Sequence, residues 1–238
     1  MLKGIQALLL DLDGTLIDIE VSFFLDTMIK SMQDHFRPHL DPAVFSDGLY
    51  GAIDAILSAP RRDGETNREA FYSAFERMTG LDASLAEKVF RAYYLEVFPG
   101  HSDQGSAAPS AEPFVRAARE KGLRLALATN PIFPAESVVE RLRWGGLAPG
   151  LFDVISVLDH MRSCKPQREY FIEMSDALGV DPERCLMVGN DVEQDLPAAE
   201  VGMKTFLVER NVIHRGTGRV DPDMRGDLEE LGRILGLW

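Results

Sequence analysis

Residues 8–16 read LLLDLDGTL, and our prediction of the fold begins from them. Its run of leucines ends abruptly at Asp11, and a short uninterrupted apolar run is typical of a strand buried on both faces of a parallel sheet. On an extended backbone, residues two apart point to the same side. Asp11 and Asp13 are therefore expected to project together from the end of this strand, where Gly14 lets the chain turn.

Further apolar runs of similar length follow this first strand along the chain. Together with the first, the predicted strands are residues 6–10, 123–128, 152–157, 185–188 and 205–208. Segments with helical periodicity lie before or between them, at residues 113–121, 134–144, 167–178 and 193–201. Strands that alternate with helices of this length predict an α/β fold with a Rossmann-like, doubly wound parallel sheet.

The apolar spacing between residues 19 and 98 is helical throughout, and we expect four helices there instead of strands. The prediction is an inserted α-helical cap domain at residues 19–99, with a catalytic core made of residues 1–18 and 100–238. A loop rich in glycine, serine, alanine and proline, residues 99–113, suits a hinge back to the sheet. The weakly amphipathic residues 228–237 could dock on the core or on a partner.

Polar residues follow the apolar runs, and in an open α/β sheet ligands bind at that edge. Thr129 and Asn130 end the second predicted strand, Lys165 precedes a helix, and the segment GNDVEQD occupies residues 189–195. Each signal has an ordinary structural alternative. Thr129 or Asn130 could cap a helix, Lys165 could be a surface lysine, and the acids of 189–195 could stabilise a helix N-terminus.

A cation would explain why carboxylates are placed so close together. Asp11 and Asp13 repel each other unless a cation or a shared proton holds them. Mg²⁺ prefers oxygen ligands and is usually held by one or two carboxylates together with substrate phosphate, and Asp191 could supply such a carboxylate. Lys165 could neutralise a phosphate. The sequence therefore predicts a site for a phosphorylated ligand and a divalent cation.

The four polar segments, in this order, resemble the motifs of the haloacid dehalogenase-like hydrolase superfamily. The match covers LLLDLDGTL at 8–16, LALATN at 125–130, Lys165 and VGNDVEQD at 188–195. The helical insert directly after the first motif is similar to one type of cap domain in that family. The resemblance implies a phosphatase in which Asp11 attacks phosphorus and forms an aspartyl-phosphate. Asp13 would protonate the leaving oxygen and later take a proton from water.

The resemblance also implies the groups that bind phosphate and metal. Thr129, Asn130 and Lys165 would hold the phosphoryl oxygens. Mg²⁺ would be bound by the Asp11 carboxylate, the Asp13 main-chain carbonyl and Asp191. Many family members read Gly-Asp-Ser or Gly-Asp-Thr in the fourth motif, whereas the acid here is displaced by one position in Gly189-Asn190-Asp191. Asn190 and Asp195 are expected in or near the metal shell.

The predicted function is hydrolysis of a small phosphorylated metabolite. A phosphomutase acting on sugar phosphates would need the same residues, and a non-catalytic member of the fold is a further alternative. Dehalogenases of the family lack an acid at the position of Asp13, which argues against that activity. Cap residues would choose the substrate, and candidates are Glu20, Phe23, Phe24, Arg61 and Arg62.

Charge and cysteine content restrict the partners and the compartment. The 238 residues carry a formal net charge of −13, which repels nucleic acid and anionic membranes, so we expect neither as a partner. A phosphorylated substrate must then be attracted by a local cation. The two cysteines form no disulfide framework, and the N-terminus lacks the pattern of a signal peptide. We expect a cytoplasmic enzyme, either a monomer or a homodimer.

Overall fold

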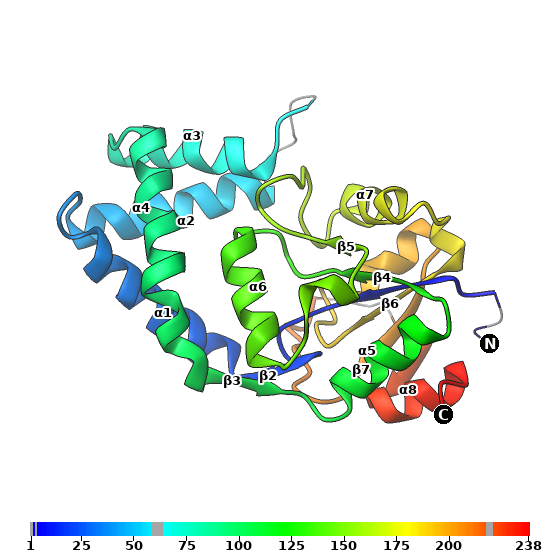
Figure 1. Cartoon of the computed structure of the whole chain (residues 1–238). Helices are drawn as coiled ribbons and strands as arrows, with labels where there is room; N and C mark the ends of the chain where they lie inside the picture. The colour runs from blue at the N-terminus through cyan, green and yellow to red at the C-terminus, as the bar shows by residue number, and fades with distance from the viewer. Residues whose placement is uncertain (1, 3, 59–63, 218–220) are drawn as a thin grey trace.

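The computed structural model describes residues 2, 4–58, 64–217 and 221–238. Within these residues, six strands pair in parallel in the order β5-β4-β1-β6-β7-β8 (Figure 1). Their bounds are Ala7–Leu10 for β1, Arg124–Leu127 for β4, Val154–Ile155 for β5, Cys185–Gly189 for β6, Lys204–Val208 for β7 and Met224–Gly226 for β8. The predicted α/β fold with a parallel sheet is confirmed. Strand order reverses beside β1, which is where ligands bind in such sheets.

Strand β1 lies inside the sheet, between β4 and β6, and both of its faces are covered. Leu8 and Leu10 face one hydrophobic cluster, and Leu9 faces the other, as the alternation of side chains along a strand requires. Helices α5 (Ala111–Glu120), α6 (Ala135–Trp144) and α8 (Leu228–Leu235) contribute to the first cluster. Helix α7 (Arg168–Leu178) and the 3₁₀ helix η4 (Leu196–Val201) contribute to the second.

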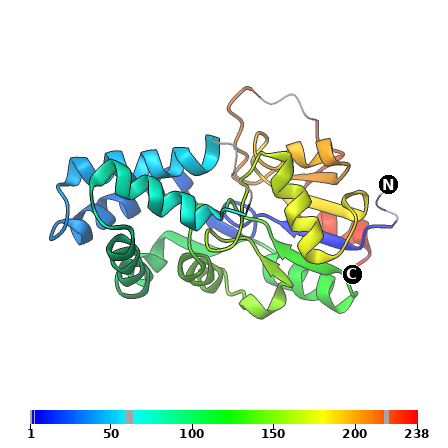
Figure 2. The ribbon, with the colours of Figure 1, turned by 90° about the horizontal axis from the view of Figure 1, so that it is seen from above.

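The segment after the first motif is helical, as predicted. It forms α1 (Val21–Phe36), α2 (Pro42–Ser58), α3 (Asn67–Thr79) and α4 (Ala83–Glu96). Figure 2 shows these helices from above, lying beyond one end of the sheet. Aromatic rings hold them together, since the ring centroid of Phe36 lies 4.6 Å from those of both Phe45 and Phe90. That they form a cap domain with the predicted limits 19–99 stays a prediction.

Helix α3 begins at hydrogen bonds to loops that follow strands β4 and β5. The backbone N–H of Asn67 donates to the Met161 carbonyl at 2.7 Å, and that of Arg68 donates to Leu158 at 3.0 Å. The fully buried Asn67 side chain donates to the Pro131 carbonyl at 3.2 Å. These bonds satisfy N–H groups that a helix start otherwise leaves unpaired, and they fix α3 above the strand ends.

The loop predicted at residues 99–113 proves to be more structured than its composition suggested. It contains the 3₁₀ helix η1 (Phe98–Gln104) and the strand β3 (Gly105–Ala107). Strand β3 pairs antiparallel with β2 (Ile17–Ile19), which directly follows the first motif. The pairing gives the helical segment two adjacent connections to the sheet. A three-residue strand is too short to leave a periodic pattern, which explains why it was missed.

The prediction of an α-helix at residues 193–201 is wrong. Residues 192–195 form a turn, and the 3₁₀ helix η4 begins only at Leu196. The Asp195 carboxylate accepts a hydrogen bond from the Asp191 backbone N–H at 2.9 Å, which stabilises the turn. Pro197 lies at the second position of η4, where its missing N–H costs little.

The C-terminal residues dock on the core. Lys121 at the end of α5 donates to the carbonyls of Leu235 and Gly236, at 2.7 and 2.9 Å. The Trp238 ring lies with its centroid 6.4 Å from that of Phe114. Of the two places left open for this amphipathic end, the structure places it on the core.

Both cysteines are buried, and neither forms a disulfide. Burial raises the pKa of the Cys185 thiol to about 11, so it is protonated at neutral pH and a poor nucleophile. In the described part of the chain, we find no helix with the length and apolar character needed to cross a membrane.

Candidate active site

A pocket of about 190 Å³ lies at the carboxyl ends of β1, β4 and β6. It is bounded by every residue that the sequence singled out for chemistry, namely Asp11, Asp13, Thr129, Asn130, Lys165, Asn190, Asp191 and Asp195. These residues come from four distant segments and meet because parallel strands end at the same edge of the sheet. We call this space the catalytic pocket.

Lys165 links two buried carboxylates. Its Nζ donates to Asp11 Oδ1 at 2.8 Å and to Asp195 Oδ1 at 2.6 Å, and all three residues are buried. Burial raises the pKa of Asp11 to about 7, against the opposing effect of Lys165. Burial also raises the pKa of Asp195. For Lys165, burial lowers the pKa, but the two carboxylates outweigh it and raise that pKa, so the lysine remains charged.

Asp13 pairs with Arg141, a residue of α6 that the sequence did not single out. The Arg141 side chain is fully buried, and its guanidinium lies 4.3 Å from the centroid of the Phe133 ring. Asp13 Oδ2 accepts its hydrogen bond, whereas Oδ1 is buried without a hydrogen-bond partner among the described residues. A signal existed in the sequence, because Arg141 lies on the helix face of Val138 and Leu142, where a charge is unexpected.

The turn after Asp13 requires glycine at position 14. Gly14 has φ of 85°, and a Cβ there would lie 2.4 Å from Asn190 Nδ2. Asn190 uses both ends of its amide. It accepts from the Thr15 hydroxyl at 3.0 Å and donates to the Asn211 carbonyl at 2.7 Å. Asn190 therefore ties the first motif to the fourth, and its place in or near a metal shell stays a prediction.

The Asp191 carboxylate is held from two sides. Its Oδ1 accepts from the backbone N–H groups of Glu193 and Gln194, both at 3.1 Å. The Arg215 guanidinium donates to Oδ1 and Oδ2, each at 2.8 Å. Arg215 belongs to the segment after β7 and also lines the pocket. Nothing in the sequence pointed to it, because its position depends on backbone pairing of Ile213 with Asn190 and Val192.

Asp195 is enclosed more tightly than Asp191. A Cβ at position 189 would lie 2.0 Å from Asp195 Oδ2, so Gly189 is needed for the carboxylate to fit beneath β6. Its two oxygens accept from Lys165 and from the Asp191 backbone. This arrangement suits Asp195 to positioning the lysine and the turn.

The end of β4 presents polar groups to the pocket. The Thr129 carbonyl accepts from the Ser156 hydroxyl at 2.9 Å and from the Tyr170 hydroxyl at 3.0 Å, which fixes the strand end. Asn130 Nδ2 donates to Gln194 Oε1 at 2.9 Å, while Asn130 Oδ1 is buried without a partner among the described residues. Gln194 lines the pocket as well and was not predicted.

The donors around the pocket fit a magnesium ion. The described residues contain no group of three His, Cys, Asp or Glu side chains placed to hold a metal by themselves. Two carboxylates, Asp11 and Asp191, nevertheless face one pocket, and a buried Asp13 oxygen lacks a partner. Mg²⁺ commonly takes one or two carboxylates and completes its shell with water and substrate phosphate.

The wall toward the helices is apolar. It includes Val21, Phe24 and Leu25 of α1, and Ile132 and Phe133 of the loop after β4. Phe24 is thus the one candidate substrate-choosing residue among the described ones that lines the pocket.

The other candidates lie elsewhere. Glu20 caps α1 by accepting from the Phe23 N–H at 2.7 Å, and Phe23 is 62% exposed. Arg61 and Arg62 lie outside the described residues.

The fold and the pocket define an α/β enzyme whose polar site lies at the strand ends, beside an inserted set of helices. The model of the haloacid dehalogenase-like hydrolase family matches residues 5–202. The chain therefore belongs to the haloacid dehalogenase-like hydrolases, which confirms the predicted family.

Two similar proteins are named as a pyrophosphatase and a phosphatase. Pyrophosphatase PpaX of Halalkalibacterium halodurans is 29% identical over 206 residues, covering 86% of this chain and 83% of the relative. The N-acetylmuramic acid 6-phosphate phosphatase of Pseudomonas aeruginosa is 28% identical over 212 residues, covering 88% and 84%. The predicted enzyme class, a haloacid dehalogenase-like phosphatase, is confirmed.

Solved structures agree in fold. The crystal structure of a HAD phosphatase from Thermococcus onnurineus superposes with a TM-score of 0.60 at 23% identity, covering 98% of each chain. An L-2-haloacid dehalogenase, RSc1362, superposes with a TM-score of 0.59 at 21% identity, covering 98% of this chain and all of the other. At such identities the likeness is one of fold alone.

Proposed function

We propose that this protein is a Mg²⁺-dependent phosphatase that hydrolyses a small phosphorylated metabolite through an aspartyl-phosphate on Asp11. The observation that carries the proposal is the meeting of Asp11, Asp13, Lys165 and Asp191 at one pocket, from four distant segments of the chain. Relatives named as phosphatases support the same reaction type.

The first step transfers the phosphoryl group to the protein. An oxygen of the Asp11 carboxylate attacks phosphorus, and the bond between phosphorus and the ester oxygen breaks. Asp13 donates its proton to that oxygen, so the alcohol leaves neutral. Arg141 holds the Asp13 side chain by an ion pair. Lys165, Thr129 and Asn130 bind the phosphoryl oxygens and stabilise their charge.

The second step restores the enzyme. Asp13 takes a proton from a water molecule, whose oxygen attacks the phosphorus of the aspartyl-phosphate. The bond from phosphorus to the Asp11 oxygen breaks, and inorganic phosphate leaves. Asp195 holds Lys165 in place during both steps, because its buried carboxylate is 2.6 Å from the ammonium.

The carboxylates of Asp11 and Asp191 and the main-chain carbonyl of Asp13 would hold the magnesium ion. When bound, Mg²⁺ supplies positive charge that neutralises the transferring phosphoryl group. The protein has a net charge of −13, so positive charge at the pocket is needed to retain a phosphate.

The test is hydrolysis of p-nitrophenyl phosphate by the wild-type protein and by Asp11→Asn. We expect hydrolysis that depends on Mg²⁺, and a loss of about a thousandfold or more in kcat for the variant, because an amide is a poor nucleophile. Asp26→Asn, on the exposed side of α1, is the matched control and retains full activity. Rapid turnover by Asp11→Asn would refute the covalent mechanism.

The phosphomutase alternative gains no support from the pocket walls. A sugar requires hydrogen-bonding groups around its hydroxyls, whereas α1 presents Val21, Phe24 and Leu25. Incubating the protein with sugar phosphates and looking for isomers distinguishes the two reactions. Cytoplasmic location and the choice between monomer and homodimer stay predictions.

A further inference from the structure

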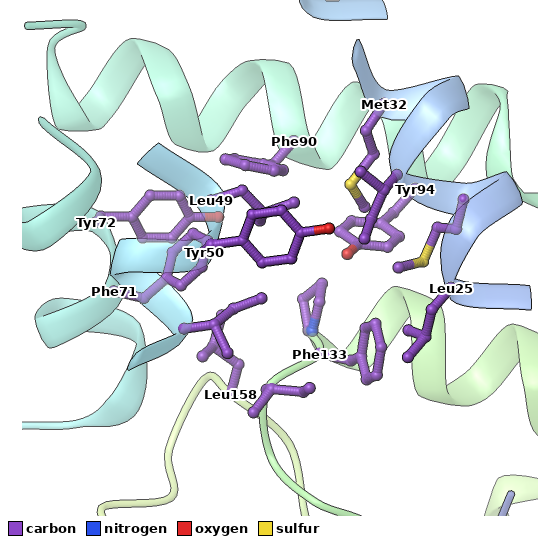
Figure 3. Close-up of a pocket in the computed structure, with 15 residues that line it drawn as sticks. Leu25, Met32, Leu49, Tyr50, Phe71, Tyr72, Phe90, Tyr94, Phe133 and Leu158 are labelled. Carbon is purple, nitrogen blue, oxygen red and sulfur yellow. The ribbon is translucent and has the colours of Figure 1, made fainter. Parts of the chain in front are cut away.

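A second cavity, of about 220 Å³, lies between α1–α4 and the loops after β4 and β5 (Figure 3). We call it the apolar cavity. Each described residue that lines it is aliphatic, a methionine, a proline or an aromatic residue. In Figure 3, Leu25, Phe71, Phe90 and Phe133 surround a common space. Tyrosine hydroxyls are the polar side-chain groups among these residues, and the rest of the lining is apolar, which suits the cavity to hydrocarbon.

The tyrosines leave the walls uncharged. Burial raises the pKa of Tyr72 above its usual range and raises that of Tyr94 still more clearly. Their hydroxyls therefore stay neutral at any physiological pH. Among the residues that the structure describes, no charged side chain lines this cavity.

The apolar cavity adjoins the catalytic pocket. Leu25, Ile132 and Phe133 line both spaces. Phe133 also lies against Arg141, whose guanidinium pairs with Asp13. A molecule whose phosphoryl group reaches Asp11 would thus have its other end directed past Leu25 and Phe133. The two spaces therefore share part of their walls, and the lining is polar at the strand ends and apolar among the helices.

The size of the apolar cavity decides what it can hold. Protein interiors are close-packed, and voids larger than a water molecule are few. An apolar cavity of about 150 Å³ stays dry and takes up benzene. The cavity here is larger than that. Tyr50, on one wall, is 57% exposed, which places that wall at the molecular surface and gives a longer chain a way out.

We propose that the apolar cavity binds the hydrocarbon part of the substrate, and that the substrate is a phosphate monoester of an apolar alcohol with a chain or ring of about six carbons or more. This inference rests on the proposed function, since it places the phosphoryl group in the catalytic pocket. Burying each methylene group strengthens binding about fourfold. The apolar cavity thus favours such esters over sugar phosphates and short-chain phosphates.

The first experiment compares n-hexyl phosphate with ethyl phosphate and glucose 6-phosphate at saturating Mg²⁺. Hexyl phosphate has four more methylene groups than ethyl phosphate, so we expect its kcat/KM to be higher by about two hundredfold. Equal values for the two alkyl phosphates, or a preference for the sugar phosphate, would overturn the inference. If none of the three releases phosphate and p-nitrophenyl phosphate is not hydrolysed either, the proposed function itself fails.

The second experiment changes the apolar cavity. Ile53 of α2 lines it and does not line the catalytic pocket. We expect Ile53→Gln to lower the ratio of hexyl to ethyl kcat/KM about tenfold, because an amide replaces hydrocarbon. Val44→Gln, at an exposed position of the same helix, keeps the wild-type ratio. A ratio unchanged in Ile53→Gln contradicts the inference.

A larger side chain provides an independent check should Ile53→Gln fold poorly. Ile53→Phe keeps the wall apolar but fills part of the space, so the longest alkyl phosphate that is hydrolysed well becomes shorter. Thermal melting by circular dichroism verifies that the variants are folded. An unaltered chain-length profile in the folded variant would exclude the cavity as the hydrocarbon site.

Discussion

Lys165 is the cation that balances two buried carboxylates, Asp11 and Asp195. Taking one partner out of a buried ion pair leaves an uncompensated charge and commonly costs about 3–5 kcal/mol. Lys165→Met should therefore lower the free energy of unfolding by about 3 kcal/mol at pH 8.5 without metal. Urea unfolding of the two proteins in a chelating buffer measures this difference.

The buried aspartates, Asp11 and Asp195, determine how the stability loss of Lys165→Met changes with pH. Burial raises the pKa of Asp11 to about 7 even with the lysine present, and removing the lysine raises it further. An acid with a raised folded-state pKa contributes stability below its unfolded pKa of 3.8, and that contribution is lost as the pH rises through the folded pKa. The deficit of Lys165→Met should thus shrink between about pH 8.5 and pH 5. A deficit that is constant over this range would contradict the proposed charge balance.

Arg141 is the positioning residue that we assign to Asp13. Its buried guanidinium joins that carboxylate and lies over the ring of Phe133. We expect Arg141→Met to lower kcat at least about tenfold with a smaller change in KM, because a general acid out of place slows the chemical step. Arg141→Lys should recover activity only in part, since lysine lacks the planar guanidinium.

The matched control for Arg141 is Arg143→Met, on the exposed side of the same helix. It should leave both kinetic constants unchanged. A pure rise in KM in Arg141→Met, with kcat intact, would show that Arg141 serves binding instead of the position of Asp13.

Residues at strand ends could be found from sequence, and residues brought in by packing could not. Asp11, Asp13, Thr129 and Asn130 directly follow apolar runs, so their convergence follows from a parallel sheet. The contacts of Arg141 and of other packed residues depend on distances that no local pattern encodes. For these packed residues, the local signal in the sequence was the position of Arg141 on the apolar face of its helix.

At the scale of elements, the segment after β7 folds back over the fourth motif. Backbone hydrogen bonds of Ile213 to Asn190 and Val192, at 3.0 and 2.9 Å, hold it there. This places the half-exposed Arg215 side chain on Asp191, the residue that we propose as a metal ligand. Because the backbone holds the segment, replacing Arg215 removes a charge without removing the segment.

Removing that charge should strengthen Mg²⁺ binding. An ion pair this exposed is worth up to about 1 kcal/mol, so we expect Arg215→Met to bind Mg²⁺ up to about fivefold more tightly. Calorimetric titration measures the affinity, and the shift of the melting temperature with Mg²⁺ provides a second readout. Asp191→Asn should lose that shift. Weaker binding by Arg215→Met would mean that the arginine supports the site.

Short elements were the ones that sequence analysis missed. The long helices and buried strands have enough residues to establish a period of 3.6 or an apolar run. Strands β2 and β3 have three residues each and pair across the whole helical insert. In place of the helix expected at 193–201, the chain forms a turn at 192–195, in which the Asp191 N–H donates to Asp195, and then the 3₁₀ helix η4.

At the scale of the whole molecule, the alternation of strands and helices was enough to predict the sheet and the edge where the site lies. The apolar cavity was out of reach, because it exists only where α1–α4 face the loop after β4. Most of the aromatic residues of the insert are buried and form its core. The sequence shows which residues are apolar, but a cavity between them can be located only in the packed structure.

The net charge of −13 gives the last prediction. A dianionic substrate approaches a molecule that repels it at long range, while Lys165 attracts it only once it is inside the pocket. Raising the salt from about 10 to about 150 mM shortens the screening length from about 30 Å to about 8 Å, which removes the long-range repulsion and leaves the buried lysine little affected. We expect kcat/KM to rise about two- to fivefold at saturating Mg²⁺ with kcat unchanged, because the effect acts on encounter. Steady-state kinetics over this salt range measures it, and a fall in kcat/KM would mean that the positive charge of the pocket dominates the field that the substrate meets.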